Sequence, residues 1–385
     1  MSIYFDHAAT TPISDLALSA LTDAAKKLGN ASSLHSAGRS VRKELEAARE
    51  QIAATIDCAP SEVIFTGTGT EANNLAIKGL YWKAAKSGKK IVITSTFEHH
   101  AVMDPILWLA EHEGAQIIQI DVDRNGVLNF DTLNKAIAEN REKIAFISIM
   151  HSNNEVGTVQ DIAQVVCLAG DIPVHSDCVQ SFGKVELSFK ELGLTAATIS
   201  AHKIGGPLGV AALILKKGLD IEPILHGGGQ ERDLRSGTFN APSILAFAAA
   251  AKESRSKLGE RSTAVRKLKQ QLIQVVKEKV ADAWVNGNQT NTLPGIVSIT
   301  FPRSDSEGLL LLLDSEGIAC STGSACSAGV QRPSHVLLAM GLSEDETTST
   351  LRFSLSYSNT IAEIEKLGLV IASVVERSRA ASGKK

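Results

Sequence analysis

The stretch Thr198-Ile199-Ser200-Ala201-His202-Lys203-Ile204-Gly205-Gly206-Pro207 decides how the chain is interpreted. An apolar run at 196–199 ends there in a polar cluster, which a glycine-rich turn follows. This pattern predicts a buried strand that places Lys203 at its carboxyl end. Ligands of open α/β sheets bind at the carboxyl ends of the strands. Lys203 is therefore the first candidate functional residue.

A second predicted strand end lies upstream, in Ile172-Pro173-Val174-His175-Ser176-Asp177-Cys178-Val179-Gln180. A lysine at one strand end and a carboxylate at another are the pair that pyridoxal phosphate (PLP) needs. The lysine can form a Schiff base, and the carboxylate keeps the pyridine nitrogen protonated, so that the ring can accept electrons. Most single lysines are solvated surface charges, so the hypothesis depends on Lys203 and Asp177 together.

The chain around these residues alternates between two hydrophobic patterns. Short apolar runs typical of strands occur at 63–65, 91–93, 117–120, 144–149, 173–174 and 196–199. Helical spacing of apolar residues occurs between them, at 36–56, 71–85, 101–113, 131–139 and 161–169. Strands interleaved with helices predict an α/β fold with a mostly parallel sheet covered on both faces.

The pattern changes in the last third of the chain. Residues 241–280 form one long helical stretch, in which Gly259 is a candidate break. Strand patterns at 296–301 and 351–355 and helical patterns at 306–315 and 360–375 then suggest an α+β unit. We predict a large domain from 16–255 and a smaller α+β domain from 1–15 and 256–385.

Composition excludes several classes of protein. No apolar run approaches the roughly 20 residues of a membrane helix, and residues 1–6 lack the basic and apolar regions of a secretory signal. The net charge of −3, without a basic block, argues against direct binding of nucleic acid. We expect a cytoplasmic protein with no membrane association.

The five cysteines are too few, and odd in number, for a disulfide framework. We expect Cys58 and Cys167 to be buried, reduced thiols. Cys320 and Cys326 do not have a usual zinc spacing, and His99-His100 lacks a second pair of ligands. No metal site is predicted.

Gly67-Thr68-Gly69-Thr70-Glu71-Ala72 follows a predicted strand and opens a predicted helix. The glycines allow backbone amides to approach an anion, Thr70 is a natural N-cap, and the helix dipole favours a phosphate group there. The stretch also fits G-x-G-x-x-A, a dinucleotide fingerprint, but no acidic residue follows at the end of the next strand. A phosphate site is the better prediction.

Arg235-Ser236-Gly237-Thr238 follows a run of three glycines at 227–229. Such a stretch is most simply a surface loop. The functional alternative is a second phosphate contact, which could belong to the active site of a neighbouring subunit.

The segment 320–329, Cys-Ser-Thr-Gly-Ser-Ala-Cys-Ser-Ala-Gly, contains no bulky residue. It predicts an accessible loop with little to pack. Cys320 lies at the base of this loop, where a thiol is expected to pack, whereas Cys326 lies beyond Gly323. Taken alone, the segment leaves open whether Cys326 is a nucleophile.

Taken together, these motifs resemble the cysteine desulfurases of the class V aminotransferase family, specifically the iron–sulfur-cluster branch called group I. The resemblance covers nearly the whole chain and is carried by residues 4–12, 29–30, 35–39, 65–74, 98–99, 150–157, 177–180, 200–203, 235–238, 321–327 and 352–354. It implies the PLP-dependent transferase architecture of fold type I.

The resemblance also implies roles for individual residues. Lys203 would hold PLP and move protons, His99 would stack on the ring and act as an acid or base, and Cys326 would accept sulfur as a persulfide. Asp177 would pair with the pyridine nitrogen and Gln180 with the ring hydroxyl. The phosphate would be bound by Gly69, Thr70, Ser200, His202 and a partner subunit's Thr238. Asn154 would contact the cofactor and, with Arg352, hold the substrate carboxylate.

The implied reaction converts L-cysteine to L-alanine and passes sulfur to an acceptor protein, an iron–sulfur scaffold or a thiolation factor, and the implied assembly is a homodimer. Two alternatives remain open at this stage. One is an aminotransferase or lyase that shares the cofactor residues, and the other is a non-catalytic sulfur-transfer subunit. The chain departs from the family at Gly205, Leu208 and Cys178, and the thiol of Cys178 is expected to be buried.

Overall fold

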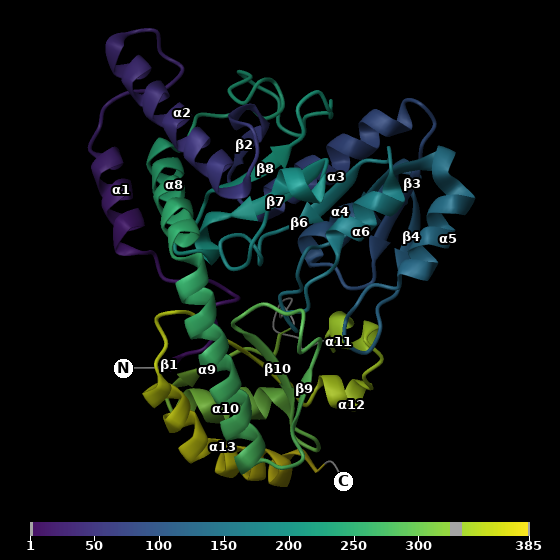
Figure 1. The fold of residues 1–385 in the computed structure, drawn as a ribbon, viewed down its shortest axis with the longest axis vertical. Helices are drawn as coiled ribbons and strands as arrows, with labels where there is room; N and C mark the ends of the chain where they lie inside the picture. The colour runs from purple at the N-terminus through teal and green to yellow at the C-terminus, as the bar shows by residue number, and fades with distance from the viewer. Residues whose placement is uncertain (1–2, 324–332, 384–385) are drawn as a thin grey trace.

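The computed structural model describes residues 3–323 and 333–383, and a twisted sheet of seven strands lies in the upper part of Figure 1. The strand order is β2-β8-β7-β6-β5-β3-β4. The strands are β2 (Val63–Thr66), β3 (Ile91–Ser95), β4 (Gln116–Ile120), β5 (Ile144–Ser148), β6 (Val174–Asp177), β7 (Ala196–Ser200) and β8 (Ala211–Leu215). Strand β8 runs antiparallel to both of its neighbours, β2 and β7, and the other neighbouring strands of this sheet pair in parallel. The predicted α/β class with a mostly parallel sheet is confirmed.

Helices cover both faces of this sheet, because alternate strand residues point to opposite sides. Ile64 and Val92 pack on one face against α3 (Gly69–Ala85) and α4 (His100–Glu113). Phe65 and Ile93 pack on the other face. The helices on that second face are α1 (Asp15–Ala25), α2 (Ser36–Ile56), α5 (Phe130–Asn140), α6 (Ile162–Ala169) and α8 (Ala241–Ser256).

The lower part of Figure 1 contains a second core, built on a three-stranded antiparallel sheet of order β12-β10-β9. Its strands are β9 (Trp284–Asn286), β10 (Ile296–Thr300) and β12 (Thr350–Ser354). The helices that pack on it are α9 (Leu258–Lys279), α10 (Ser306–Ser315) and α13 (Ile361–Ser382). A short parallel pair, β1 (Ile3–Tyr4) with β11 (Ile318–Ala319), adds the N-terminal segment to this core.

The predicted domain division, 16–255 against 1–15 with 256–385, stays a prediction. The long helical stretch does break, but at Lys257 between α8 and α9 and not at Gly259. Residues of 336–342, in and after the short helix α11 (His335–Ala339), pack with the core of the large sheet. The remaining short elements are α7 (Phe189–Leu192), α12 (Glu344–Thr347), η1 (Pro60–Glu62), η2 (Arg141–Lys143) and η3 (Ala201–Lys203).

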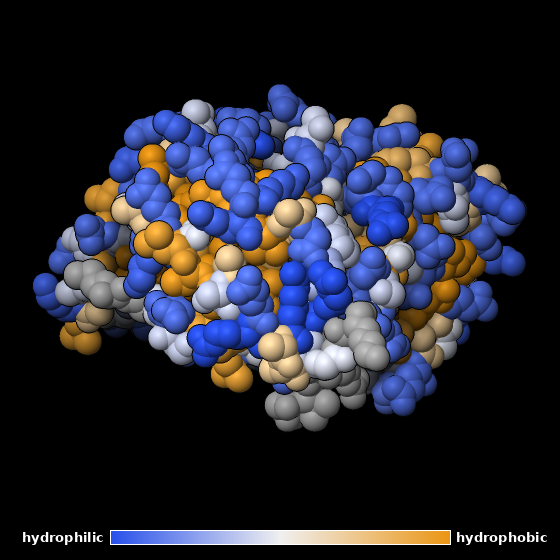
Figure 2. All heavy atoms as spheres, turned by 90° about the horizontal axis from the view of Figure 1, so that it is seen from below, coloured by the Kyte–Doolittle hydropathy of each residue, from blue (hydrophilic) through white to orange (hydrophobic). Residues whose placement is uncertain are grey.

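The surface seen from the end that carries α13 is mainly hydrophilic, with a patch of apolar residues among the polar ones (Figure 2). Exposed large apolar side chains of α10 and α13 include Leu311 and Leu369. Among the described residues, no helix combines the length and the apolar character needed to cross a membrane.

Candidate active site

A cavity of about 680 Å³ opens at the carboxyl ends of the parallel strands. It contains most of the residues that the sequence singled out. The predicted residues that line it are Gly69, Thr70, His99, Asn154, Asp177, Gln180, Ser200, His202, Lys203 and Arg352. We call it the front cavity. The cavity lies where ligands of open α/β sheets bind, at the carboxyl ends of the strands.

Lys203 reaches this cavity from η3, the single turn that follows β7. Its Nζ donates hydrogen bonds to the backbone oxygens of Ala8, at 2.5 Å, and Ala9, at 2.8 Å. Burial and the positive charge of Arg352 lower the pKa of Lys203 to about 8, although Asp177 and Asp6 oppose this shift. The uncharged amine, which is the nucleophilic form, is therefore much more populated near neutral pH than in an ordinary lysine.

Asp177 is the last residue of β6 and lies beside β7 in the sheet. Its carboxylate is buried and accepts two hydrogen bonds, from Asn73 Nδ2 at 2.8 Å and from the backbone N–H of Val179 at 2.9 Å. These donors fix the orientation of the carboxylate in the wall of the cavity. Asn73, which comes from α3, lies inside the motif at 65–74 but was not predicted individually as a site residue.

The phosphate prediction falls at the first turn of α3, and one detail of it was wrong. The helix begins at Gly69, and its N-cap is Thr68 rather than Thr70, because Thr68 Oγ1 accepts from the N–H of Glu71 at 3.0 Å. The first N–H groups of a helix lack partners within the helix, so those of Gly69 and Thr70 are available to an anion. A Cβ at Gly69 would lie 3.2 Å from Val179 Cγ2, so a side chain there would crowd the cavity wall.

Ser200 and His202 line the same cavity from the end of β7 and the turn after it. Burial and the charges of Lys203 and Lys184 lower the pKa of His202 to about 4, so its ring is neutral at pH 7. Thr10 Oγ1 lies 3.3 Å from its Nδ1. The neutral ring can donate one hydrogen bond to an anion without adding charge.

His99 follows β3 and caps the N-terminus of α4. Its Nδ1 accepts the N–H of Ala101 at 3.0 Å, so the proton of the neutral ring is on Nε2. Burial is the main cause of a lowered pKa at His99, and the charge of Lys203 adds to it, whereas Asp177 opposes it. His99 is therefore a neutral ring at the mouth of an open cavity, and it can exchange a proton.

Arg352 belongs to β12, so the small sheet contributes a residue to the lining of the front cavity. It is buried, and its guanidinium donates to Asp6 Oδ1 at 2.7 Å and to the backbone oxygen of Asn154 at 3.0 Å. Its Nε has no partner among the described residues. A buried guanidinium with a spare donor suits an incoming carboxylate. Asp6 was not predicted as a site residue.

Two further residues, Glu155 and His335, line the front cavity and were not predicted individually. Glu155 is buried and accepts a hydrogen bond from Ser334 Oγ at 2.6 Å, and burial raises the pKa of its carboxyl group. His335 Nε2 lies 2.9 Å from the backbone oxygen of Glu98. Glu155 lies inside the motif at 150–157, so the sequence carried a signal for it, whereas His335 stands outside every quoted motif.

Thr238 is not among the residues that line the front cavity of this chain. It is exposed and follows Arg235, which forms an ion pair with Glu71 of α3 at 2.8 Å. The ion pair holds this stretch against the helix whose N-terminus faces the cavity. A contact between Thr238 and the phosphate of a partner subunit stays a prediction.

The cysteines differ in their surroundings. Cys320 is buried, and burial raises its pKa to about 12, so it is a protonated thiol at neutral pH. Cys178 is buried as expected, but Cys167 is exposed, and the expectation that it is buried was wrong. Cys326 lies outside the described residues. Gly323, three residues before it, lines the front cavity.

PLP fits this arrangement of residues. The cavity offers an amine of lowered pKa, a buried carboxylate held by two donors, and a helix N-terminus free of bulky side chains. These are the three features that the cofactor's aldehyde, pyridine nitrogen and phosphate require. Within the described residues, no group of three or more His, Cys, Asp or Glu side chains is placed to hold a metal ion.

The family model for class-V aminotransferases matches residues 3–367. An IscS-like cysteine desulfurase from Mycobacterium tuberculosis is 42% identical over 384 residues, which cover 98% of each chain. Among solved structures, a NifS-like protein superposes with a TM-score of 0.91 at 33% identity and covers 98% of this chain and 100% of its own. SspA in complex with cysteine has a TM-score of 0.81 at 32% identity and covers 93% and 100%.

The family match spans nearly the whole chain, and PLP-dependent enzymes of this family share the fold described above. The dinucleotide alternative for residues 67–72 is thereby set aside, because the members of this family are PLP-dependent. This chain belongs to the class-V aminotransferase family and, within it, to the cysteine desulfurases.

Proposed function

We propose that the protein removes sulfur from L-cysteine, producing L-alanine and a persulfide on Cys326, with PLP bound at Lys203. The observation that carries this proposal is the front cavity, where Lys203, Asp177, His99 and Arg352 converge. The cysteine desulfurase relatives support the choice of reaction. The structure of SspA with cysteine supports the choice of substrate.

When bound, PLP supplies an electron sink for negative charge that develops on the substrate carbons. The chain supplies the proton transfers. Lys203 has a pKa lowered to about 8, so its Nζ can take a proton from the substrate α-carbon and return one later. His99 presents the proton of Nε2 and is a second acid or base on the cavity side. Asp177 is held in place by Asn73 and Val179 and keeps the pyridine nitrogen protonated.

Arg352 and Asn154 hold the carboxylate of the substrate in this proposal. The N–H group at Nε of Arg352 has no partner among the described residues and can donate to the carboxylate, and the bond to Asp6 keeps the guanidinium plane fixed. A guanidinium that is already oriented loses little conformational freedom when a carboxylate binds. Gln180 faces the ring hydroxyl, and Gly69, Thr70, Ser200 and His202 bind the phosphate.

Sulfur transfer then requires a thiolate. The thiolate of Cys326 attacks the substrate sulfur, so that an S–S bond forms and the bond between the β-carbon and sulfur breaks. The electron pair of the broken bond stays with the carbon, which takes a proton and becomes the methyl group of alanine. The substrate sulfur is oxidised to the sulfane level, and the carbon is reduced. Cys320 is unsuited to this step, because burial keeps it protonated.

The assembly and the acceptor are further parts of the proposal. A homodimer would bring Thr238 of the partner subunit to the phosphate, which agrees with the absence of Thr238 from the lining of this chain's own cavity. The acceptor would be an iron–sulfur scaffold or a thiolation factor. The proposed location is the cytoplasm, and no direct role for nucleic acid is proposed.

The test measures sulfide and alanine from L-cysteine in the presence of a reductant, beside amino transfer from cysteine or alanine to a keto acid. Equal amounts of alanine and sulfide, with no amino transfer, are expected. Amino transfer without sulfide would favour an aminotransferase, and the loss of both activities in the PLP-loaded protein would favour a non-catalytic sulfur-transfer subunit.

A further inference from the structure

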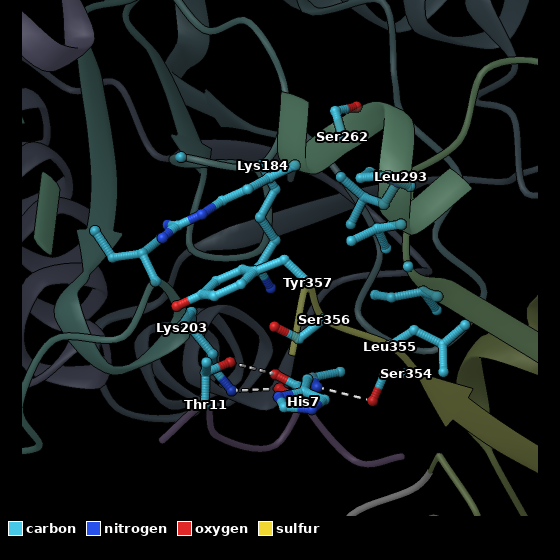
Figure 3. A pocket seen from close by; sticks show the side chains of 18 of the residues that line it. His7, Thr11, Lys184, Lys203, Ser262, Leu293, Ser354, Leu355, Ser356 and Tyr357 are labelled. Carbon is cyan, nitrogen blue, oxygen red and sulfur yellow. Dashed lines mark hydrogen bonds between the residues drawn. The ribbon is translucent and has the colours of Figure 1, made fainter. Parts of the chain in front are cut away.

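A second, smaller cavity also reaches Lys203, and residues of α9 and of the β12 end help to line it (Figure 3). Its volume is about 70 Å³, enough for a few water molecules. We call it the rear cavity. Lys203 and Ala8 line both cavities, so they form the wall between them. Lys184 lines the rear cavity only, and the reaction proposed above gives it no role.

Lys184 has no acidic partner in the described part of the chain. The charges that act on it are those of Lys203 and Arg352, both positive, and together with burial they lower its pKa to about 7. No Asp or Glu of the described residues lines the rear cavity. Lys184 is half-buried. Removing a lysine from water without a carboxylate partner costs free energy, so its position calls for a functional explanation.

The backbone holds Lys184 in this place. Gly183, immediately before it, has a φ of +70°, and a Cβ there would lie 2.7 Å from Ser254 Oγ and 2.9 Å from Ile204 Cγ2. Only glycine allows the turn to approach α8 this closely. The N–H of Lys184 also donates to the backbone oxygen of Ser181 at 3.0 Å. The backbone of Lys184, and with it the Cα from which the side chain extends, is therefore held in place.

The side chain of Lys184 is linked to Lys203 through one amide group. Lys184 Nζ donates to Gln180 Oε1 at 3.1 Å, and Gln180 Nε2 donates to the backbone oxygen of Ala8 at 2.9 Å. The same oxygen of Ala8 accepts the bond from Lys203 Nζ. Figure 3 shows the Lys184 and Lys203 side chains entering the region of this cavity from different segments.

This network decides the orientation of the Gln180 amide. A backbone carbonyl can only accept, so the NH₂ group of the amide must face Ala8. The amide oxygen then faces Lys184, whose Nζ donates to it. One of the two N–H bonds of Nε2 is used by Ala8. The other remains for the front cavity, which Gln180 also lines.

We propose that Lys184 is a positioning residue that holds the Gln180 amide as a hydrogen-bond donor toward the ring oxygen of PLP. The proposal depends on PLP binding at Lys203, as set out under the proposed function. With the amide in this orientation, Gln180 favours the anionic form of the ring oxygen. Reversal of the amide would place an oxygen against that anion and would disfavour it.

Several charged or titratable groups surround Lys184 and bear on the test. They are His7, His202, Lys203, Arg261, Arg352 and Tyr357. Burial and the charge of Lys184 lower the pKa of His7 to about 4. Arg261 is paired with Glu253 on α8, and its guanidinium lies 3.7 Å from the ring centroid of Tyr357. None of these groups supplies a negative charge to Lys184.

The experiment titrates the absorbance of the Lys203-bound cofactor with pH in the holoenzyme, without substrate. Lys184→Met removes the ammonium but keeps the length of the side chain. The midpoint should move upward by about one pH unit, a roughly tenfold change in proton affinity, because the ring oxygen loses the donor that stabilises its anion. Lys184→Arg, which can also donate to Gln180 Oε1, should restore most of the shift.

Gln180→Ala tests whether the effect passes through the amide. In that background, Lys184→Met should move the midpoint by less than half of its effect in the native protein. A shift of full size in the Gln180→Ala background would show that Lys184 acts as a charge through space and would overturn the proposal. No shift in the native background would overturn it equally. Lys184→Ala, which also cannot donate to Gln180 Oε1, replaces Lys184→Met if the latter is insoluble.

Lys269→Met is the matched control. Lys269 on α9 is also buried, and burial lowers its pKa to about 8. Its Nζ donates to Thr292 Oγ1 at 3.1 Å and to the backbone oxygen of Leu293 at 3.2 Å, and it lines neither cavity. Its replacement should leave the spectral midpoint unchanged. If the unmodified protein binds no PLP at Lys203, the proposed function fails, which is a different result from a bound cofactor that is insensitive to Lys184.

Discussion

The two cavities that meet at Lys203 differ in size and in charge. The front cavity has about 680 Å³ and is lined by three carboxylates, Asp6, Glu155 and Asp177. The rear cavity has about 70 Å³, and its lining in the described residues includes Lys184 and Arg261 but no carboxylate. The front cavity can accommodate a cofactor with a substrate and balance its charges. The rear cavity has room only for small molecules such as water. We therefore expect Lys184 to matter through its bond to Gln180, which lines the front cavity.

The largest expected effect is that of Lys203→Ala, which alters the wall itself. Turnover should fall by at least about 10³-fold, because both the attachment of the cofactor and the main proton transfer are lost. Release of sulfide and alanine measures the loss. Borohydride treatment of the native protein, followed by peptide mapping, should place the reduced cofactor on Lys203, and a cofactor found on Lys184 would reverse the assignment of front and rear.

Cys326→Ala should lose desulfuration nearly completely while still binding cysteine, because Lys203, Asp177 and Arg352 are unchanged. The measurement combines sulfide release with the absorbance change on addition of cysteine. Cys320→Ala is the matched control and should keep most of the activity, since its thiol is buried and protonated. Mass spectrometry that finds the extra sulfur on Cys320 after cysteine treatment would refute this assignment.

A smaller effect is expected from Thr238→Ala, which should weaken PLP binding by about fivefold through the loss of one hydrogen bond. A mixed dimer of Lys203→Ala and Thr238→Ala subunits tells whose cavity Thr238 completes. If it completes the partner's cavity, one site carries both defects and the other neither. That intact site should then bind PLP with native affinity and give about half of the native activity. A weakened remaining site would place Thr238 in its own subunit's cavity.

The last prediction concerns Lys269, outside both cavities, where no effect on activity is expected and the free energy of unfolding is measured instead. Its folded-state pKa, about 8, lies below the ordinary value of 10.5. The unfolded chain therefore binds more protons between these two pH values, and the free energy of unfolding should rise with pH across that window. Lys269→Met should remove up to about 3 kcal/mol of this rise in the apoprotein. Denaturant titrations at pH 7.5, 9 and 10.5, values chosen to span the window, would measure it, and an unchanged slope would contradict the assigned shift.

Much of the fold could be predicted because strand and helix periodicities are local. The predicted helices at 36–56 and 306–315 match α2 and α10. Strand β8 was missed, although Ala211–Leu215 is wholly apolar. It runs antiparallel without a helix before it, so the alternation that revealed the other strands gave no signal there.

Site residues could be predicted where the chemistry requires one type of side chain. They could not be predicted where several nearby residues of a suitable type were available and only the backbone conformation decides between them. Lys203 and Asp177 stand at strand ends with an evident chemical pairing. The N-cap of α3 was misplaced by two residues, because Thr68 and Thr70 are equally suitable by type and only the backbone decides between them. Asp6, Asn73 and Lys184 act through contacts between distant parts of the chain, and a single sequence does not show these contacts.

The short pair β1–β11 has a consequence for how the chain can change in length. Ile3 is paired with Ile318, and the N–H of Phe5 donates to the backbone oxygen of Ala319, so the first residues are held beside the residue that precedes Cys320. Only a few residues later, Ala8 and Ala9 accept the bonds of Lys203. An insertion or deletion between Phe5 and Ala8 would displace the surroundings of Lys203 relative to Cys320, so this stretch should not tolerate a change in its number of residues.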